Sequence, residues 1–199
     1  MSSNSYSKNL NNHQIKRAGL AELTRNAKQF IAVLFISGLM IMPSYAASWR
    51  DELPNATLVG SGHFRWFGFK IYSAKLWSEN ARFNANSKFA LELTYNRSIS
   101  RKQFIKTTID EIKRLNGNQI SAEKLATWEK ELIPASPDVS SGDELIGVYL
   151  PAQGYRVYNK QGLLADIQDP ELARAFFAIW LDPRTKDSGL RAQLLGTEK

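Results

Sequence analysis

The order of strand-like and helix-like segments is the feature that most constrains the fold of this chain. The strand-like segments, rich in aromatic and β-branched residues, form two groups of three: 57–67, 69–77 and 89–95, then 144–150, 155–159 and 163–167. Two helical segments follow each group, and they begin near the capping residues Ser100, Ser121, Asp169 and Ser188. Because strands do not alternate singly with helices, the order predicts an α+β fold, an antiparallel sheet with a layer of helices on one face, and disfavours a Rossmann-type fold.

Apolar residues indicate which faces are buried. In the segment 89–95, large apolar side chains alternate with Ala90, Glu92 and Thr94, which predicts a strand in a sheet with one covered face. Phe64 and Trp66 are likewise predicted to belong to the core. The aromatic stripe of residues 176–181 has helical spacing, so it is expected to pack on the sheet or, alternatively, to form one wall of an apolar pocket.

The first 46 residues are predicted to be a signal peptide. Five basic residues precede an apolar run of 13 residues, 30–42, and small residues then occupy positions 44 and 46. Cleavage is expected after Ala46, so that residues 47–199 form one domain in the periplasm or outside the cell. A bilayer-spanning helix needs roughly 20 apolar residues, so an uncleaved anchor over 30–42 is the less favoured alternative.

Charge and composition exclude several classes of function. Removing residues 1–46 from the 199-residue chain leaves 153 residues and lowers the formal charge from +7 to +3, because five basic residues and Glu22 are lost. The remaining charges are mixed along the chain and give no nucleic-acid footprint. The chain has no cysteine, and His63 is the one histidine after residue 46, so a zinc site is not expected. We expect no metal, no cofactor and no membrane contact after cleavage.

The stretch GSGHFRWFGFKIYSAKLW, residues 60–77, holds the candidate site residues His63, Arg65, Ser73 and Tyr72. Its glycines lack the lysine of a phosphate-binding loop and are expected at a bend or bulge. His63 and Arg65 share one face of an uninterrupted strand. The guanidinium of Arg65 can bind a carboxylate or enolate through two parallel hydrogen bonds, or it can lie exposed along the sheet. Tyr72 can donate a hydrogen bond to a ligand or be a core residue.

Four blocks of the sequence carry a resemblance: LVGSGHFRWFGFKIYSAKLW, FALELTYNRSISR, GDELIGVYLP and RAFFAIWLDPRTKDSGLRAQLLG. Together they resemble the bacterial exported chalcone-isomerase-like family over residues 57–196. The resemblance implies the chalcone isomerase fold, with a cleft between sheet and helices. In that family, plant isomerases close a flavanone ring, and fatty-acid-binding members hold a carboxylate with an arginine and a tyrosine.

The resemblance transfers the ligand residues only in part. The family's arginine falls at His63 or, with a slip of one step along the strand, at Arg65, and its strand threonine falls at Ser73. Its tyrosine, asparagine and late-helix threonine fall near Ile99, Lys106 and Ile179, whose side chains do not replace them. Chalcone cyclisation is therefore not expected.

Three hypotheses follow. The favoured one is a non-catalytic exported domain that binds a small amphipathic or fatty-acid-like ligand in the sheet–helix cleft through His63, Arg65, Ser73 and Tyr72. The second is an isomerase or lyase with an unknown substrate and His63 as general base, which requires a partly closed pocket around His63. The third is an interaction module of the cell envelope, which requires an exposed apolar patch.

Overall fold

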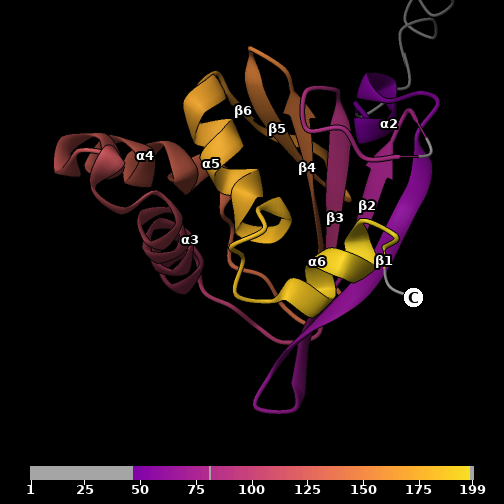
Figure 1. The fold of residues 1–199 in the computed structure, drawn as a ribbon, viewed down its shortest axis with the longest axis horizontal. Coiled ribbons are helices and arrows are strands. Elements are labelled where there is room, and N and C mark those ends of the chain that lie inside the picture. Colours follow the sequence, from indigo (N-terminus) through magenta and orange to yellow (C-terminus); the bar gives the residue numbers. More distant parts are fainter. Residues whose placement is uncertain (1–46, 81, 198–199) are drawn as a thin grey trace, which may run out of the picture. The chain divides into compact units, whose positions relative to one another are not determined.

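The computed structural model describes residues 47–80 and 82–197 (Figure 1). The predicted signal peptide, residues 1–46, lies outside the described residues. Spatial contacts divide the chain into two units, 1–45 and 46–199, and the second unit contains the fold described below. Within the described residues, no helix has the length and apolar character needed to cross a bilayer.

Six strands form one sheet in the order β1-β2-β3-β4-β5-β6, and every neighbouring pair is antiparallel. The strands are β1 (Thr57–Trp66), β2 (Phe69–Ser78), β3 (Phe89–Tyr95), β4 (Glu144–Leu150), β5 (Gly154–Asn159) and β6 (Gly162–Ile167). The predicted antiparallel α+β architecture is therefore confirmed. Every connection within each group of three strands joins neighbours in the sheet.

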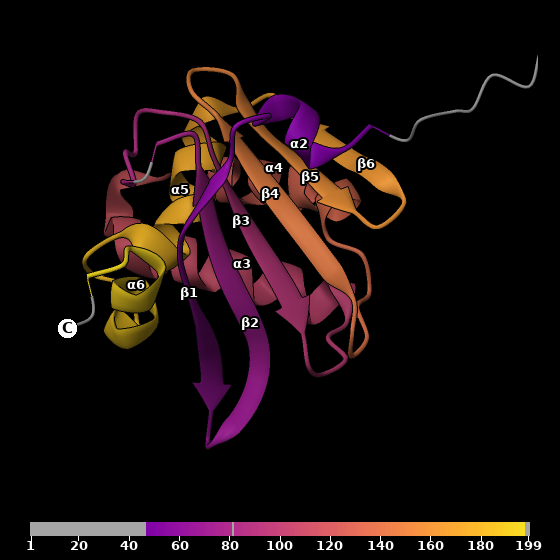
Figure 2. The same ribbon diagram turned by 90° about the vertical axis from the view of Figure 1, so that its right-hand side faces the viewer.

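A layer of helices covers one face of this sheet (Figures 1 and 2). Its members are α3 (Arg101–Asn116), the 3₁₀ turn η1 (Gly117–Gln119), α4 (Ala122–Ala135), α5 (Pro170–Leu181) and α6 (Ser188–Leu194). Side chains cap these helices near the predicted positions, except that Asp187 rather than Ser188 caps α6. Ile112, Trp128 and Leu172 are fully buried in the core between this layer and the sheet.

The opposite face of the sheet is also covered in its middle, where the sequence predicted a single covered face. The short helix α2 (Trp49–Glu52) is followed by Leu53, which packs on Ala90, Ile146 and Val148, and all four side chains are buried. Glu92 is buried on this same face and accepts hydrogen bonds from Lys75 Nζ at 2.6 Å and Trp77 Nε1 at 2.9 Å. The alternation of 89–95 did not reveal this cover because Ala90 and Glu92 are small or charged.

The β1–β2 hairpin leaves the sheet at its tip. Its two-residue loop, Phe67–Gly68, has φ of 46° and 80°, and positive φ at both positions is what a type I′ turn requires. Glycine or asparagine suits such positions, whereas a bulky residue at positive φ costs about 1 kcal/mol. Trp66 is 58% exposed, so its prediction as a core residue is wrong, while Phe64 does pack against the core.

Gly60 and Gly62 let α6 approach β1 closely. A Cβ atom on Gly60 would lie 2.1 Å from the carbonyl oxygen of Gln193, and one on Gly62 would lie 2.8 Å from Leu190 Cδ1. The predicted bulge is present one residue earlier, since Leu58 pairs with Trp77 and Gly60 pairs with Leu76. The glycines of GSG are therefore needed mainly for the close contact between α6 and β1.

Candidate functional site

The four predicted site residues lie on different sides of the hairpin. His63 pairs with Ser73, and both alternate with Phe64 and Tyr72, whose side chains pack toward the helices. His63 and Ser73 therefore face away from the helix layer. Arg65 is exposed near the tip, where its Nη1 atom donates to the carbonyl oxygen of Gly68 at 3.3 Å.

His63 lacks the surroundings that the isomerase hypothesis requires. Its side chain is exposed. Partial desolvation, followed by the positive charges of Lys70 and Arg65, lowers the pKa of His63 below its ordinary value. The positions where the family's other polar residues would fall form no site either. Ile99 forms a backbone bridge with Val139, and Lys106 forms an ion pair with Asp110. Ile179 packs on the core.

Tyr72 is the predicted site residue that enters the space between sheet and helices. Its hydroxyl accepts a hydrogen bond from Trp180 Nε1 at 2.9 Å, and its ring meets Tyr95 edge-on with 6.1 Å between centroids. Burial raises the pKa of Tyr72 and of Tyr95, so both phenols are neutral. Within the described part of the chain, the buried hydroxyl of Tyr95 has no hydrogen-bond partner.

Aromatic side chains fill the predicted cleft between sheet and helices. Phe177 packs edge-on against Phe89 and Tyr149, and Phe176 stacks on Tyr155 at 4.9 Å between centroids. A cavity of about 20 Å³ remains beside Tyr95. Because a water molecule needs roughly 10–15 Å³ by such a measure, this cavity has room for one water but not for a lipid.

A much larger hollow, of about 560 Å³, runs along α5, and its lining includes Phe89 and Tyr149 of the sheet. We call it the α5 groove. The loop between β2 and β3 lines one side, the end of α3 with η1 and Trp128 of α4 lines the other, and α5 forms the floor. The lining mixes polar side chains with apolar ones, and the apolar ones include Phe83, Leu115, Ile120 and Phe177. None of the four residues predicted as a site lines it.

The local sequence of α5 explains why the groove is hollow. Asp169 caps the helix by accepting hydrogen bonds from the backbone nitrogens of Glu171 and Leu172 at 2.8 and 2.9 Å. Its other oxygen accepts from Trp128 Nε1 at 2.8 Å, which fixes α4 beside α5. On the groove side, α5 then presents Ala175 and Ala178. These small side chains leave open the volume that larger residues would fill.

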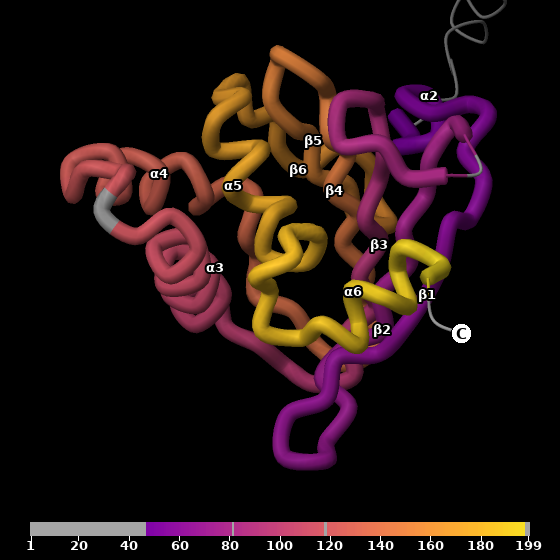
Figure 3. Tube along the Cα trace, in the orientation of Figure 1, coloured from indigo at the N-terminus to yellow at the C-terminus, as the bar shows by residue number. Residues whose placement is uncertain are grey.

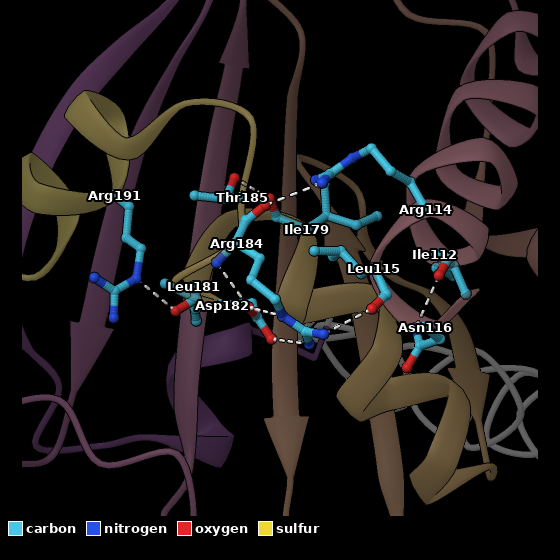
Figure 4. A network of polar contacts seen from close by, with 10 residues as sticks. All are labelled: Ile112, Arg114, Leu115, Asn116, Ile179, Leu181, Asp182, Arg184, Thr185 and Arg191. Carbon is cyan, nitrogen blue, oxygen red and sulfur yellow. Dashed lines mark hydrogen bonds and ion pairs between the residues drawn. The ribbon is translucent and has the colours of Figure 1, made fainter. Parts of the chain in front are cut away.

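A network of polar contacts (Figure 4) includes Leu115, Asp182 and Arg184, which line the α5 groove. Arg184 donates to both carboxylate oxygens of Asp182, at 2.9 and 2.8 Å, and to the carbonyl oxygen of Leu115 at 2.9 Å. Hydrogen bonds from Arg184 lower the pKa of Asp182 to about 2. Arg114 Nη1 donates in turn to the carbonyl oxygen of Arg184 at 3.0 Å. The guanidinium of Arg184 is therefore already occupied.

Arg174 is the groove cation that remains available. It is exposed on α5 and has no hydrogen bond or ion pair with any residue that the structure describes. Glu171, one turn earlier on α5, pairs with Lys124 instead. A guanidinium can bind a carboxylate or phosphate through two parallel hydrogen bonds. Among the described residues, the groove therefore combines apolar side chains with one cation that has no ion pair. Among residues 47–80 and 82–197, no cluster of three metal-ligating side chains is found.

Comparison with known proteins identifies the family. A family model described as chalcone isomerase-like matches residues 50–196. The chain belongs to the chalcone isomerase-like family. It is also 34% identical over 142 residues to an uncharacterized protein of Haemophilus influenzae, and this match covers 71% of the chain and 68% of that protein. The predicted resemblance is confirmed.

A solved structure shares the chalcone isomerase-like fold. The crystal structure of a fatty-acid binding protein of Arabidopsis thaliana superposes with a TM-score of 0.54 at 12% sequence identity. The match covers 71% of this chain and 87% of that chain. At this level of identity, the likeness shows the fold.

Sequence reasoning identified one wall of the groove and missed its cation. The aromatic stripe 176–181 was predicted as core or pocket wall, and Phe177 is both, since it is buried in the core and also lines the groove. Arg174 gave no signal, because one arginine on the polar side of an amphipathic helix is ordinary. Phe83 lies in a loop, where the sequence gives no position relative to α5.

Proposed function

We propose that this chain is an exported, non-catalytic domain that binds a small amphipathic molecule of the fatty-acid class in the α5 groove. The observation that carries the proposal is a hollow of about 560 Å³ with apolar and polar walls, whose lining includes Arg174, a cation with no ion pair among the described residues. Ligand pockets for small molecules have volumes of about 300–1,000 Å³. The fatty-acid binding described for the Arabidopsis thaliana structure of the same fold supports this class of ligand.

In this proposal, the alkyl tail and the carboxylate of the ligand would contact different residues of the groove. The alkyl tail would lie over Ala175 and Ala178, between Phe83 on one side and Ile120 on the other. Removing this tail from water supplies the main driving force. The carboxylate would bind Arg174, because the other arginine in the lining, Arg184, is held by Asp182. The proposal gives His63, Arg65 and Ser73 no contact with the ligand.

Isothermal titration with dodecanoate and with dodecanol, its uncharged counterpart, tests two parts of the proposal separately: binding of the carboxylate by Arg174 and binding of the tail by the groove. Wild type should bind dodecanoate, and Arg174→Ala should weaken it about tenfold, the size of a lost charge-assisted hydrogen bond. Affinity for dodecanol should be unchanged by Arg174→Ala. Ala178→Phe should weaken both ligands, because the new ring occupies the place of the tail.

Lys102→Ala is the matched control, since Lys102 is also an exposed cation but lies on α3 away from the groove lining. It should leave both affinities unchanged. The proposal fails if wild type binds neither ligand, or if Arg174→Ala and Lys102→Ala bind dodecanoate equally well.

Export is a separate part of the proposal. The basic and apolar segments of residues 1–46 support a cleaved signal peptide. N-terminal sequencing of protein from the periplasm should begin at Ala47. Recovery of the intact chain from the membrane fraction would favour the anchor over 30–42 instead.

A further inference from the structure

The tip of the β1–β2 hairpin projects beyond the end of the sheet (Figures 1, 2 and 3). The last register pair between β2 and β3 is Tyr72–Tyr95, yet β2 extends to Phe69. With a rise of roughly 3.3 Å per residue, the tip extends about 10 Å past that pair. The residues at its end, Trp66, Phe67 and Phe69, are 58%, 86% and 60% exposed. We call this surface the hairpin tip.

Trp66 and Phe67, two of the three exposed rings, are in contact, and Phe69 is the register partner of Trp66. Trp66 contacts Phe67 edge-on at 5.1 Å between centroids and also stacks on Phe64 at 6.5 Å. Phe64 stacks in turn on Tyr72 at 5.1 Å, so this row of rings continues to the core. Single exposed apolar residues are common on soluble proteins, whereas a contiguous apolar patch marks a contact surface.

The turn itself contradicts a purely structural role for Phe67. Its φ of 46° belongs to the left-handed region, where asparagine or glycine is favoured in a type I′ turn. Phe67 is also the most exposed of the large apolar residues described. The sequence therefore places a bulky apolar side chain where it adds backbone strain and gains almost no burial. Strain of this kind points to a requirement other than folding.

Positive charge surrounds the aromatic tip. Arg65 and Lys70 form a cross-strand pair beside the turn, and Arg97 lies over the ring of Phe69 at 5.1 Å. The sequence from 53 to 78 contains no acidic residue. In the neighbouring strands, Glu92 of β3 pairs with Lys75, farther along β2 from the turn, and Asp143 and Glu144 lie at the start of β4. The lowered pKa of His63, caused by desolvation and by Lys70 and Arg65, is consistent with a local excess of positive charge.

We propose that the hairpin tip docks on the surface of an anionic lipid bilayer, with Trp66, Phe67 and Phe69 inserted among the headgroups and the surrounding cations on lipid phosphates. Aromatic rings favour this interface, and basic side chains are attracted to anionic lipid. Amphipathic helices that lie on a membrane without crossing it bury their apolar face by about 5–10 Å, and the hairpin tip is long enough to reach a similar depth. The charge favours a lipid surface over a second copy, because two tips would bring like charges together. This inference differs from the expectation of no membrane contact and does not rest on the α5 groove.

Fluorescence of Trp66 tests the inference in the full chain, independently of any other segment that binds lipid. The probe is a set of vesicles of phosphatidylcholine with or without phosphatidylglycerol, carrying brominated acyl chains that quench tryptophan. The Trp66 signal is the difference between wild type and Trp66→Phe. We expect anionic vesicles to quench this signal, and high salt or Arg65→Gln combined with Lys70→Gln to reduce the quenching.

Phe67→Asn separates docking from folding. Asparagine suits the turn, so the melting temperature should be unchanged or higher, whereas partitioning of the tip to anionic vesicles should weaken about tenfold, the size expected for losing one buried phenylalanine. Leu163→Thr is the control, because Leu163 is a half-exposed apolar residue elsewhere in the sheet. It should leave Trp66 quenching unchanged.

Three results would overturn the inference. The first is an absence of Trp66 quenching on anionic vesicles, even where the protein itself is bound. The second is equal quenching in wild type and Phe67→Asn. The third is a self-association measured by sedimentation that Phe67→Asn abolishes while Trp66 stays unquenched by lipid, which would assign the tip to a protein contact.

Discussion

Two aromatic stretches of this chain have similar compositions and opposite environments. In α5, Phe176, Phe177 and Trp180 are at most 8% exposed, whereas Trp66 and Phe67 at the hairpin tip are more than half exposed. The α5 helix lies over the sheet, where Phe177 meets the flat surface that Gly147 leaves in β4. The hairpin tip extends past the last β2–β3 pair, so no strand or helix among the described residues covers it. Position relative to the edge of the sheet, and not aromatic content, decides which stretch is core.

The largest expected difference between the two stretches is in the free energy of unfolding when one ring is truncated in each. Phe177→Ala should lower the free energy of unfolding by about 3–5 kcal/mol, because it removes a buried ring and leaves a cavity. Phe67→Ala should change it by less than about 0.5 kcal/mol, as for an exposed position. Denaturant unfolding of both variants measures the difference. Similar losses at the two sites would contradict the contrast in burial.

An intermediate effect is expected where the end of α5 is anchored. Asp182→Asn should lower the free energy of unfolding by about 1 kcal/mol, a value kept small because Arg184 is largely exposed to solvent. The pKa of Asp182 is held at about 2, below its ordinary 3.8, by hydrogen bonds from Arg184. A carboxyl whose pKa is lower in the folded state than in the unfolded state stabilises the fold at pH values above its unfolded-state pKa. This stability is lost as the pH falls through the folded-state pKa.

The difference between wild type and Asp182→Asn should therefore be constant above about pH 5 and should shrink between about pH 4 and pH 2. Asp110→Asn is the control, since Asp110 pairs with Lys106 on the exposed side of α3. It should change stability by less than about 0.5 kcal/mol. A difference that does not vary with pH would show that the carboxylate charge of Asp182 is not what anchors the segment.

The smallest effect is expected at the turn of the hairpin tip. Phe67→Asn should raise the free energy of unfolding by up to about 1 kcal/mol, because asparagine tolerates the positive φ. Differential scanning calorimetry beside wild type measures it. A clear loss of stability would mean that the ring of Phe67 makes native contacts, and would remove the strain argument for a docking role.

The sequence predicted the fold more completely than the site. Capping residues and strand patterns are local signals, so the strands and helices were predicted with nearly correct bounds, and their order predicted the sheet. The site depends on distances between distant segments. Arg174 and Phe83 are far apart in the sequence, and only the packing of α5 against the β2–β3 loop brings them to one groove.

In the hairpin, too, the sequence predicted side-chain burial only in part. Alternation correctly predicted that His63 and Phe64 lie on opposite faces of the strand. No local pattern shows that β2 continues past the end of β3. Trp66 was therefore predicted as core because it is aromatic and shares a strand face with Phe64. The glycines at 60 and 62 carried a real signal, but its cause, the close approach of α6, lies more than a hundred residues away along the chain.

The most direct test of the central claim is to locate a bound fatty acid by nuclear magnetic resonance. A stearic acid with a nitroxide on its tail broadens the amide signals that lie close to it. We expect the strongest broadening at Ala175, Ala178 and Leu115, which line the α5 groove. Broadening centred on Tyr95 and Leu93, beside the small core cavity, would place the ligand between sheet and helices and would contradict the groove as the binding site.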